Sequence, residues 1–141
     1  MKTLVIFYSY SGCTKALAAT VAAEGHDTVE IRDARHPGKF RAYSVGCFAA
    51  MRGKAWPIQP FDAELTAYDR LILLAPVWAG NPPPAVNALL ERLPEGKAVW
   101  VKLVSSSGKS SCKARLEALI AAKGCSLESF EDIREKTIER K

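Results

Sequence analysis

The chain opens with MKTLVIFYSYSGCTK (Met1–Lys15), a stretch that changes character at Ser9. Residues 4–8 are apolar or aromatic, as in a buried β-strand. From Ser9 onward hydroxyl side chains gather around a single glycine, and an Ala-rich segment at 13–24 then carries apolar residues four positions apart. That spacing is typical of a helix that packs one face on a sheet. The opening therefore predicts a strand, a hydroxyl-rich loop and a helix.

The alternation of strand and helix patterns continues along the chain. Short apolar or alternating runs predict strands, and apolar residues spaced three and four apart predict helices. Further strands are predicted at 26–33, 71–77, 97–104 and 125–133, and further helices at 43–51, 81–93 and 112–123. The last strand is ambiguous, because Leu127, Phe130 and Ile133 also fit a helix. Its position after a helix in the series favours the strand.

These elements predict an α/β fold with three layers, in which helices cover both faces of a parallel sheet. The run Leu71–Val77 is apolar throughout, as expected for a central strand that is buried on both faces. A length of 141 residues suits a single domain over 1–141. Sheets of this kind bind ligands beyond the carboxyl ends of their strands. Three strand-to-helix loops therefore become the candidate site.

The composition is that of an ordinary soluble globular protein, with 48% hydrophobic and 25% charged residues. No apolar run approaches the roughly 18 residues that span a bilayer, and no signal-peptide pattern surrounds residues 4–8. The cysteines form no CxxC pair and no metal-ligand spacing with histidine; they are Cys13, Cys47, Cys112 and Cys125. We expect a cytoplasmic protein with reduced thiols, no membrane span and no metal.

One segment carries the whole positive excess of the chain. The formal net charge is +5, and residues 34–61 hold five cations and no acid, namely Arg35, Lys39, Arg41, Arg52 and Lys54. The segment is interpreted either as a binding surface for an anion or as a solvated face on a mobile loop. The anion could belong to a phosphate-bearing cofactor, an acidic partner or a nucleic acid. Nucleic acid has the least support, because no nucleic-acid-binding motif accompanies the charge.

The first loop has the features of a phosphate cradle. A loop that leads into a helix N-terminus presents unpaired N–H groups and the positive end of the helix dipole. Ser9, Ser11 and Thr14 add hydroxyl donors, and Gly12 lets the backbone curl around a phosphate. The loop is neither a Walker A motif nor a GxGxxG fingerprint. The alternative is a helix that is merely well capped.

The second and third loops offer a surface for a flat ligand. In PVWAGNPPP (76–84), Trp78 follows a buried strand and can stack on an aromatic ring. Asn81 is expected to cap a helix whose first turn holds three prolines. The third loop, SSSGKSS (105–111), brings small donors and a glycine to another strand end. Together the three loops predict a site for a phosphate at one end and a planar heterocycle at the other.

The motifs in this order resemble those of the flavodoxin-like family of FMN-binding proteins. Family members carry a [ST]-x-[ST]-G-x-[ST] loop, matched by residues 9–14, and a PVWxG-type loop, matched by residues 76–80. The resemblance runs from Met1 to about Ile133 and implies a sheet of order 2-1-3-4-5. It implies that the phosphate of FMN lies on the first loop and the ring between the other two. The implied contact residues are Ser9, Tyr10, Ser11, Gly12, Cys13, Thr14, Pro76, Val77, Trp78, Ala79, Gly80, Asn81, Ser105, Ser106, Ser107 and Gly108.

The resemblance implies an electron-transfer flavoprotein that passes electrons from FMN to a redox partner protein, with no residue in a catalytic role. The alternative is an NAD(P)H-dependent reductase of quinones or free FMN, which would use the same site. A scaffold that has lost the cofactor is a third interpretation. Phosphatase chemistry at Cys13 has little support, because the CxxxxxR motif needs an arginine where Ala19 stands.

The sequence departs from the family in two ways that bear on the flavin. Residues 105–111 contain no aromatic side chain, so one flavin face is open unless Tyr10 or a side chain from 34–61 covers it. Low-potential flavodoxins surround the ring with acids, but the nearest charged loop residue here is Lys109. A cation stabilises the anionic reduced flavin, so we expect a less negative reduction potential. Trp56 is expected to close over the flavin or, in a homodimer, to seat a second subunit.

Overall fold

The computed structural model describes residues 2–8, 13–34, 38, 42–61 and 63–137. Its centre is a sheet of five parallel strands in the order β2-β1-β3-β4-β5. The strands are β1 Thr3–Phe7, β2 Asp27–Glu30, β3 Arg70–Pro76, β4 Ala98–Ser105 and β5 Ser126–Arg134. The α-helices are α1 Cys13–Ala22, α3 Cys47–Met51, α4 Pro84–Leu90 and α5 Lys113–Ala122. Short turns of helix are η1 Ala42–Gly46, η2 Leu65–Ala67 and η3 Glu135–Thr137.

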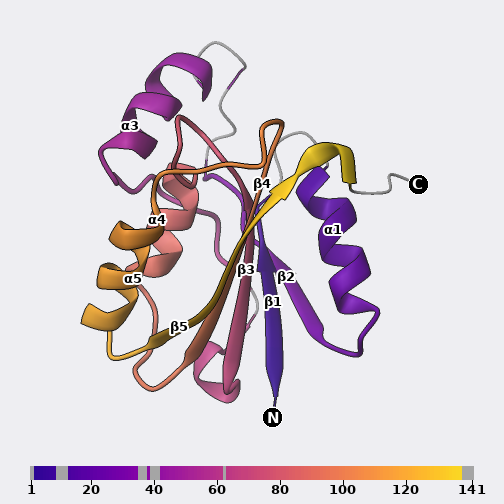
Figure 1. Ribbon diagram of the computed structural model, residues 1–141. Helices are drawn as coiled ribbons and strands as arrows, with labels where there is room; N and C mark the ends of the chain where they lie inside the picture. The colour runs from indigo at the N-terminus through magenta and orange to yellow at the C-terminus, as the bar shows by residue number, and fades with distance from the viewer. Residues whose placement is uncertain (1, 9–12, 35–37, 39–41, 62, 138–141) are drawn as a thin grey trace.

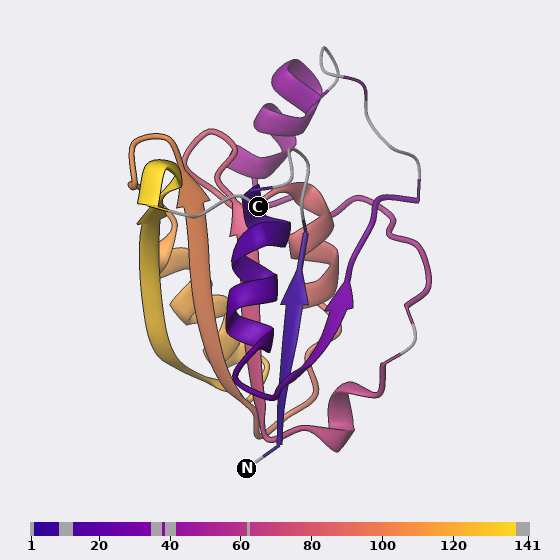
Figure 2. The same cartoon turned by 90° about the vertical axis from the view of Figure 1, so that its right-hand side faces the viewer.

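The predicted order of the sheet is confirmed, and so is the strand prediction for the C-terminal segment. α4 and α5 cover one face of the sheet and α1 covers the other, which gives the three layers (Figure 1). A second view places α1 across the front of the sheet and α3 near its upper end (Figure 2). None of the helices in the described ranges is long and apolar enough to cross a membrane.

The layers follow from the period-two alternation of each strand. In β1, Leu4 and Ile6 join the large core beneath α4 and α5, and Val5 and Phe7 join the smaller core beneath α1. Successive side chains of a strand point to opposite faces, so an apolar run without polar breaks supplies both cores at once. Residues 71–75 of β3 are all buried, which confirms the central strand that the sequence predicts.

The start of α4 differs from the prediction. Asn81 does not cap the helix: α4 begins at Pro84 after an extended Pro83, and the cap makes no side-chain hydrogen bond. The Asn81 side chain instead donates from Nδ2 to the carbonyl of Ala79 at 3.1 Å. The reason lies in Pro82–Pro84, because a residue followed by proline is pushed out of the α region. The helix can therefore begin only at the last proline of the run.

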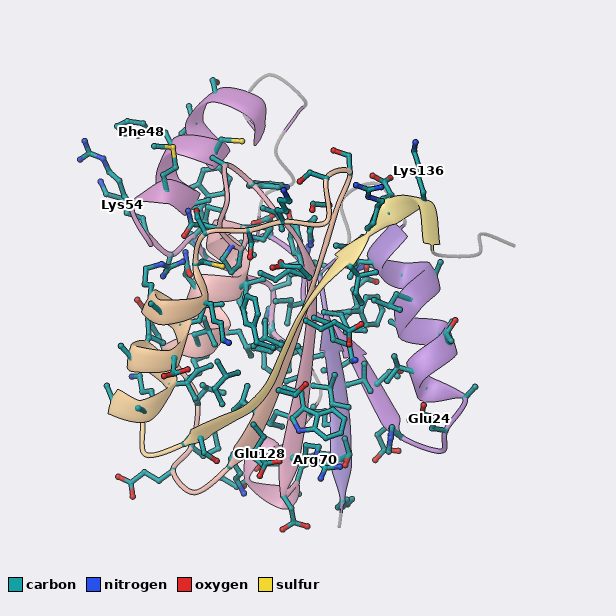
Figure 3. The ribbon with its side chains drawn as sticks, in the orientation of Figure 1. Glu24, Phe48, Lys54, Arg70, Glu128 and Lys136 are labelled. Atoms are coloured by element: carbon teal, nitrogen blue, oxygen red, sulfur yellow. The ribbon has the colours of Figure 1, made fainter. Side chains whose placement is uncertain are left out.

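The edge strand β5 is covered on the α1 side by polar pairs. Trp100 of β4 donates from Nε1 to Glu128 at 3.2 Å, and the Arg70 guanidinium lies 4.3 Å from the centre of a Trp100 ring. Lys102 pairs with Glu131 at 3.0 Å. Figure 3 shows Arg70 and Glu128 close together at the lower end of the sheet. In the part of the chain that the structure describes, these groups and not a second helix cover β4 and β5 on this side.

Candidate functional site

The three candidate loops meet at the carboxyl edge of the sheet, because they follow the neighbouring strands β1, β3 and β4. Four residues of the first loop lie outside the described residues, namely Ser9, Tyr10, Ser11 and Gly12. α1 begins with Cys13 directly after that loop, and Thr14 in its first turn is only 2% exposed. The first N–H groups of an α-helix have no partner within the helix. The strand, loop and helix order of an anion site is therefore present.

The loop after β3 is built on a tight turn at Trp78–Asn81. The backbone N–H of Trp78 donates to the carbonyl of Asn81 at 2.6 Å, and the N–H of Asn81 donates back at 3.1 Å. The two central residues, Ala79 and Gly80, have φ values of 51° and 81°, as in a type I′ turn. The left-handed conformation costs an alanine about 1 kcal/mol. The N–H groups of Ala79 and Gly80 take no part in the two hydrogen bonds of the turn.

Trp78 is held between the end of β1 and the 42–46 turn. Its ring meets that of Tyr8 edge to face, with centroids 6.0 Å apart and planes at 81°. A Cβ placed on Gly46 would lie 2.7 Å from Cζ3 of Trp78, so only glycine permits this approach. The indole is partly buried. The prediction that Trp78 offers a stacking surface stays a prediction, but the contacts that fix its orientation are now defined.

A buried tyrosine and carboxylate beside Trp78 were not found by sequence reasoning. The Tyr8 hydroxyl donates to Oδ2 of Asp33 at 2.5 Å, and the two residues are 3% and 5% exposed. Asp33 is held in place by its bridge to Ile58 and by Gln59, whose Nε2 donates to the Asp33 carbonyl at 3.1 Å. The available signal was the position of both residues just past the ends of neighbouring strands, where polar side chains reach the ligand edge.

The loop after β4 is folded by one hydroxyl. Oγ of Ser105 accepts from the N–H of Gly108 at 2.9 Å and from that of Lys109 at 3.2 Å. Gly108 has φ 70° and lies against Arg134, since a Cβ added to it would be 3.2 Å from Cβ of Arg134. Ser106 and Ser107 are exposed. The Ser105 hydroxyl shapes the loop, and the site residues free to face a ligand are the two serines that follow.

The second and third loops are joined to each other. The N–H of Ser111 donates to the carbonyl of Gly80 at 2.8 Å. A Cβ on Gly80 would clash with Oγ of Ser111. Arg115 of α5 adds a second link, donating from Nη2 to Oδ1 of Asn81 at 3.3 Å. Both loops therefore form one connected wall of the candidate site.

The thiols of Cys47 and Cys112 are held in their protonated, unreactive form. Burial raises the pKa of the Cys112 thiol, which is 1% exposed at the start of α5. Burial also raises the pKa of the Cys47 thiol. A raised pKa keeps a thiol protonated and unreactive at neutral pH. Within the described ranges, no three His, Cys, Asp or Glu side chains come together as a metal site would require.

Comparison with known proteins gives structural relatives only. Neither a protein-family model nor a curated protein matches the sequence. A flavoprotein from Lactobacillus acidophilus NCFM, solved in complex with FMN, is 20% identical with a TM-score of 0.75, covering 96% of this chain and 94% of its own. A flavoprotein from Bacteroides eggerthii is 21% identical with a TM-score of 0.77, and the match covers 97% of this chain and 92% of the Bacteroides chain. An NADPH-quinone reductase from P. pentosaceus is 12% identical with a TM-score of 0.58, and the match covers 99% of this chain and 89% of the reductase chain.

At these identities the likeness concerns the fold, and it agrees with the strand order found here. A parallel sheet of order 2-1-3-4-5 with helices on both faces is the flavodoxin-like arrangement. The resemblance seen in two short sequence motifs is thus matched by the path of nearly the whole chain. The protein has the flavodoxin-like fold.

Proposed function

We propose that this protein binds FMN at the carboxyl edge of its sheet and transfers electrons through it. The main observation in support is that the second and third loops are hydrogen-bonded to each other and form one wall. In this wall, the left-handed turn at Ala79 and Gly80 does not use the N–H groups of these two residues in its own hydrogen bonds. Backbone strain of this kind accumulates where a ligand is bound. The FMN complex of the structurally similar Lactobacillus acidophilus flavoprotein supports the same cofactor.

The residues present fit the two ends of this cofactor. The N-terminus of α1 and the Thr14 hydroxyl suit the phosphate, because N–H groups and the helix dipole both attract an oxyanion. The wall at Trp78–Gly80 suits the ring, because a partly buried indole is followed directly by two N–H groups that the turn does not use. Bound FMN supplies reversible one- and two-electron chemistry. The protein supplies its orientation and its electrostatic surroundings.

The charges near the third loop bear on the reduction potential. Lys109 is exposed on this loop, and Arg134 lies against Gly108 at the end of β5. Cations favour the anionic reduced flavin, so the expectation of a less negative potential than in acidic flavodoxins stands as part of the proposal. A redox titration of the FMN-loaded protein tests it, and a hydroquinone couple as negative as in those carriers contradicts it.

The proposal is tested by titrating the protein with FMN and following the quenching of tryptophan fluorescence. We expect Thr14→Val to weaken FMN binding about tenfold, because one charge-assisted hydrogen bond to the phosphate is lost. Thr20→Val is the matched control: Thr20 lies on the same helix, is exposed, and bonds only the carbonyl of Ala16 among the contacts found. Equal affinity of the two variants, or no binding by the wild type, overturns the proposal.

A reductase that takes hydride from NAD(P)H is the second candidate. The structural similarity to an NADPH-quinone reductase favours it, and the cations of 34–61 could meet the phosphates of the nucleotide. The two candidates separate when the FMN-loaded protein is mixed with NADPH or NADH without oxygen and absorbance near 450 nm is followed. We expect no bleaching on the timescale of turnover, and rapid bleaching would establish the reductase instead.

A further inference from the structure

The η1–α3 segment exposes a row of large apolar side chains. Val45, Phe48 and Met51 are 46%, 53% and 57% exposed, and they are the large apolar residues found exposed in the described part of the chain. Residues three apart are neighbours on a helix surface. The opposite side of α3 is buried through Ala49 and Ala50. The helix therefore packs with its small side chains and leaves its large ones in water.

Two cations lie at the C-terminal end of this apolar row. The Arg52 guanidinium lies 4.4 Å from the centre of the Phe48 ring. Lys54 is exposed beside it, and Phe48 and Lys54 both project away from the sheet (Figure 3). No acid occurs in the sequence from 34 to 61. We call Val45, Phe48, Met51, Arg52 and Lys54 the α3 face.

The α3 face rests on a fixed base. Asn87 of α4 donates from Nδ2 to the carbonyl of Lys54 at 2.9 Å, and the N–H of Trp56 donates to the carbonyl of Pro84 at 3.2 Å. At the other end of the segment, Gly46 touches the indole of Trp78. The apolar row is thus held directly against the candidate site. A protein bound on this face would lie next to the wall proposed to hold the flavin.

We infer that the α3 face is the docking surface for an acidic electron-transfer partner protein. The inference rests on the proposed function for the electron that is exchanged. Exposed apolar groups bordered by polar side chains are typical of interaction sites. Neighbouring cations select and steer a partner with a negative surface. In the exchange one electron leaves the reduced centre of one protein and enters the oxidised centre of the other, and no bond is made or broken.

Two other occupants fit the α3 face less well. In a two-fold symmetric dimer the same patch meets itself, so Arg52 and Lys54 of one copy would face cations of the other. An anionic membrane also attracts cations, but helices that lie in a membrane surface bury a long apolar face. α3 has five residues and offers three large apolar side chains with η1.

The inference is tested with a plant-type ferredoxin, an acidic one-electron carrier, as the probe. Binding of oxidised ferredoxin to the protein is measured by titration calorimetry at low ionic strength and again at about 0.3 M salt, which screens surface charges. We expect binding that weakens with salt, and a loss of about tenfold in affinity for Phe48→Ser and for Arg52→Glu. Both side chains are exposed, so neither change threatens the fold.

Arg92→Glu is the matched control, since Arg92 is exposed beyond the far end of α4 and undergoes the same change in charge. We expect its affinity to stay within about twofold of the wild type. The rate at which reduced ferredoxin reduces the FMN-loaded protein should follow the same order of variants. FMN titrations on the same samples separate a failure to bind cofactor from a failure to dock.

The inference is overturned if ferredoxin does not bind, or if all three variants bind it alike. It is also overturned if sedimentation shows a dimer that Phe48→Ser abolishes, because a second copy then occupies the face. Sedimentation with phosphatidylserine vesicles that is lost in Phe48→Ser would assign the face to a membrane and would overturn it as well.

Discussion

The loops after β3 and β4 form one wall of the site, but they are shaped by different means. The loop after β3 turns at Ala79 and Gly80, two left-handed residues whose backbone closes on itself between Trp78 and Asn81. The loop after β4 is closed by a side chain, the hydroxyl of Ser105. The two loops meet where the backbone N–H and the hydroxyl of Ser111 both donate to the carbonyl of Gly80.

The difference shows which substitutions each loop tolerates. A loop shaped by its backbone depends on the absence of side-chain volume, so it should fail when atoms are added. A loop closed by a hydroxyl depends on one acceptor, so it should fail when that atom is removed. Each loop therefore has its own sensitive position, Gly80 in the loop after β3 and Ser105 in the loop after β4.

Adding volume at Gly80 should have the largest effect. Gly80→Ala introduces a Cβ that clashes with Ser111 and forces alanine to φ 81°. We expect the free energy of unfolding to fall by about 1–2 kcal/mol from left-handed strain, with a smaller further loss because the Ser111 hydroxyl must rotate away from the carbonyl of Gly80. Urea denaturation measures it. Gly96→Ala is the control, because Gly96 has φ 80° with nothing within 4 Å of the added Cβ. If both variants lose equal stability, the inter-loop contact contributes nothing.

Removing the hydroxyl of Ser105 should have an intermediate effect. Ser105→Ala leaves the N–H groups of Gly108 and Lys109 without their acceptor, and we expect a loss of about 1 kcal/mol in the free energy of unfolding. The neighbouring change Ser106→Ala, at an exposed position, should stay within about 0.5 kcal/mol. Equal effects from the two serines would mean that the loop is not closed by Ser105.

Relieving strain at Ala79 should have the smallest effect and the opposite sign. Ala79→Gly removes the penalty of a left-handed alanine but makes the unfolded chain more flexible, so we expect a net gain of about 0.5 kcal/mol. Ala118→Gly on the exposed side of α5 should instead lose about 1 kcal/mol. Thermal unfolding of both variants gives the comparison, and a loss at both positions would show that the turn is not strained.

The fold was predictable because it rests on patterns that a single strand or helix carries by itself. The apolar run of β3 and the strand–loop–helix order at α1 each require only local sequence, and the strand order followed from the family resemblance. The prediction that Asn81 caps α4 was wrong. The preference of asparagine for helix caps was outweighed by the extended conformation that consecutive prolines impose on the residues before them.

The contacts inside the site could not be predicted from the sequence. The pairing of Tyr8 with Asp33 joins residues 25 positions apart, and the approach of Gly46 to Trp78 joins two loops that no local pattern relates. Gly46 inside a helical pattern was the one available signal, since such a glycine often marks close packing. Even so, the sequence does not tell which side chain packs against it.

The polar side chains along β5 affect whether two copies of the protein can pair through this edge of the sheet. An open parallel sheet ends in strands with unused N–H and carbonyl groups, which can template pairing with another chain. Along β5 the exposed residues include Glu128, Glu131 and Asp132, so two copies that approached strand to strand would bring acid against acid. This negative charge disfavours pairing between two β5 edges, and salt that screens the charge should weaken the repulsion.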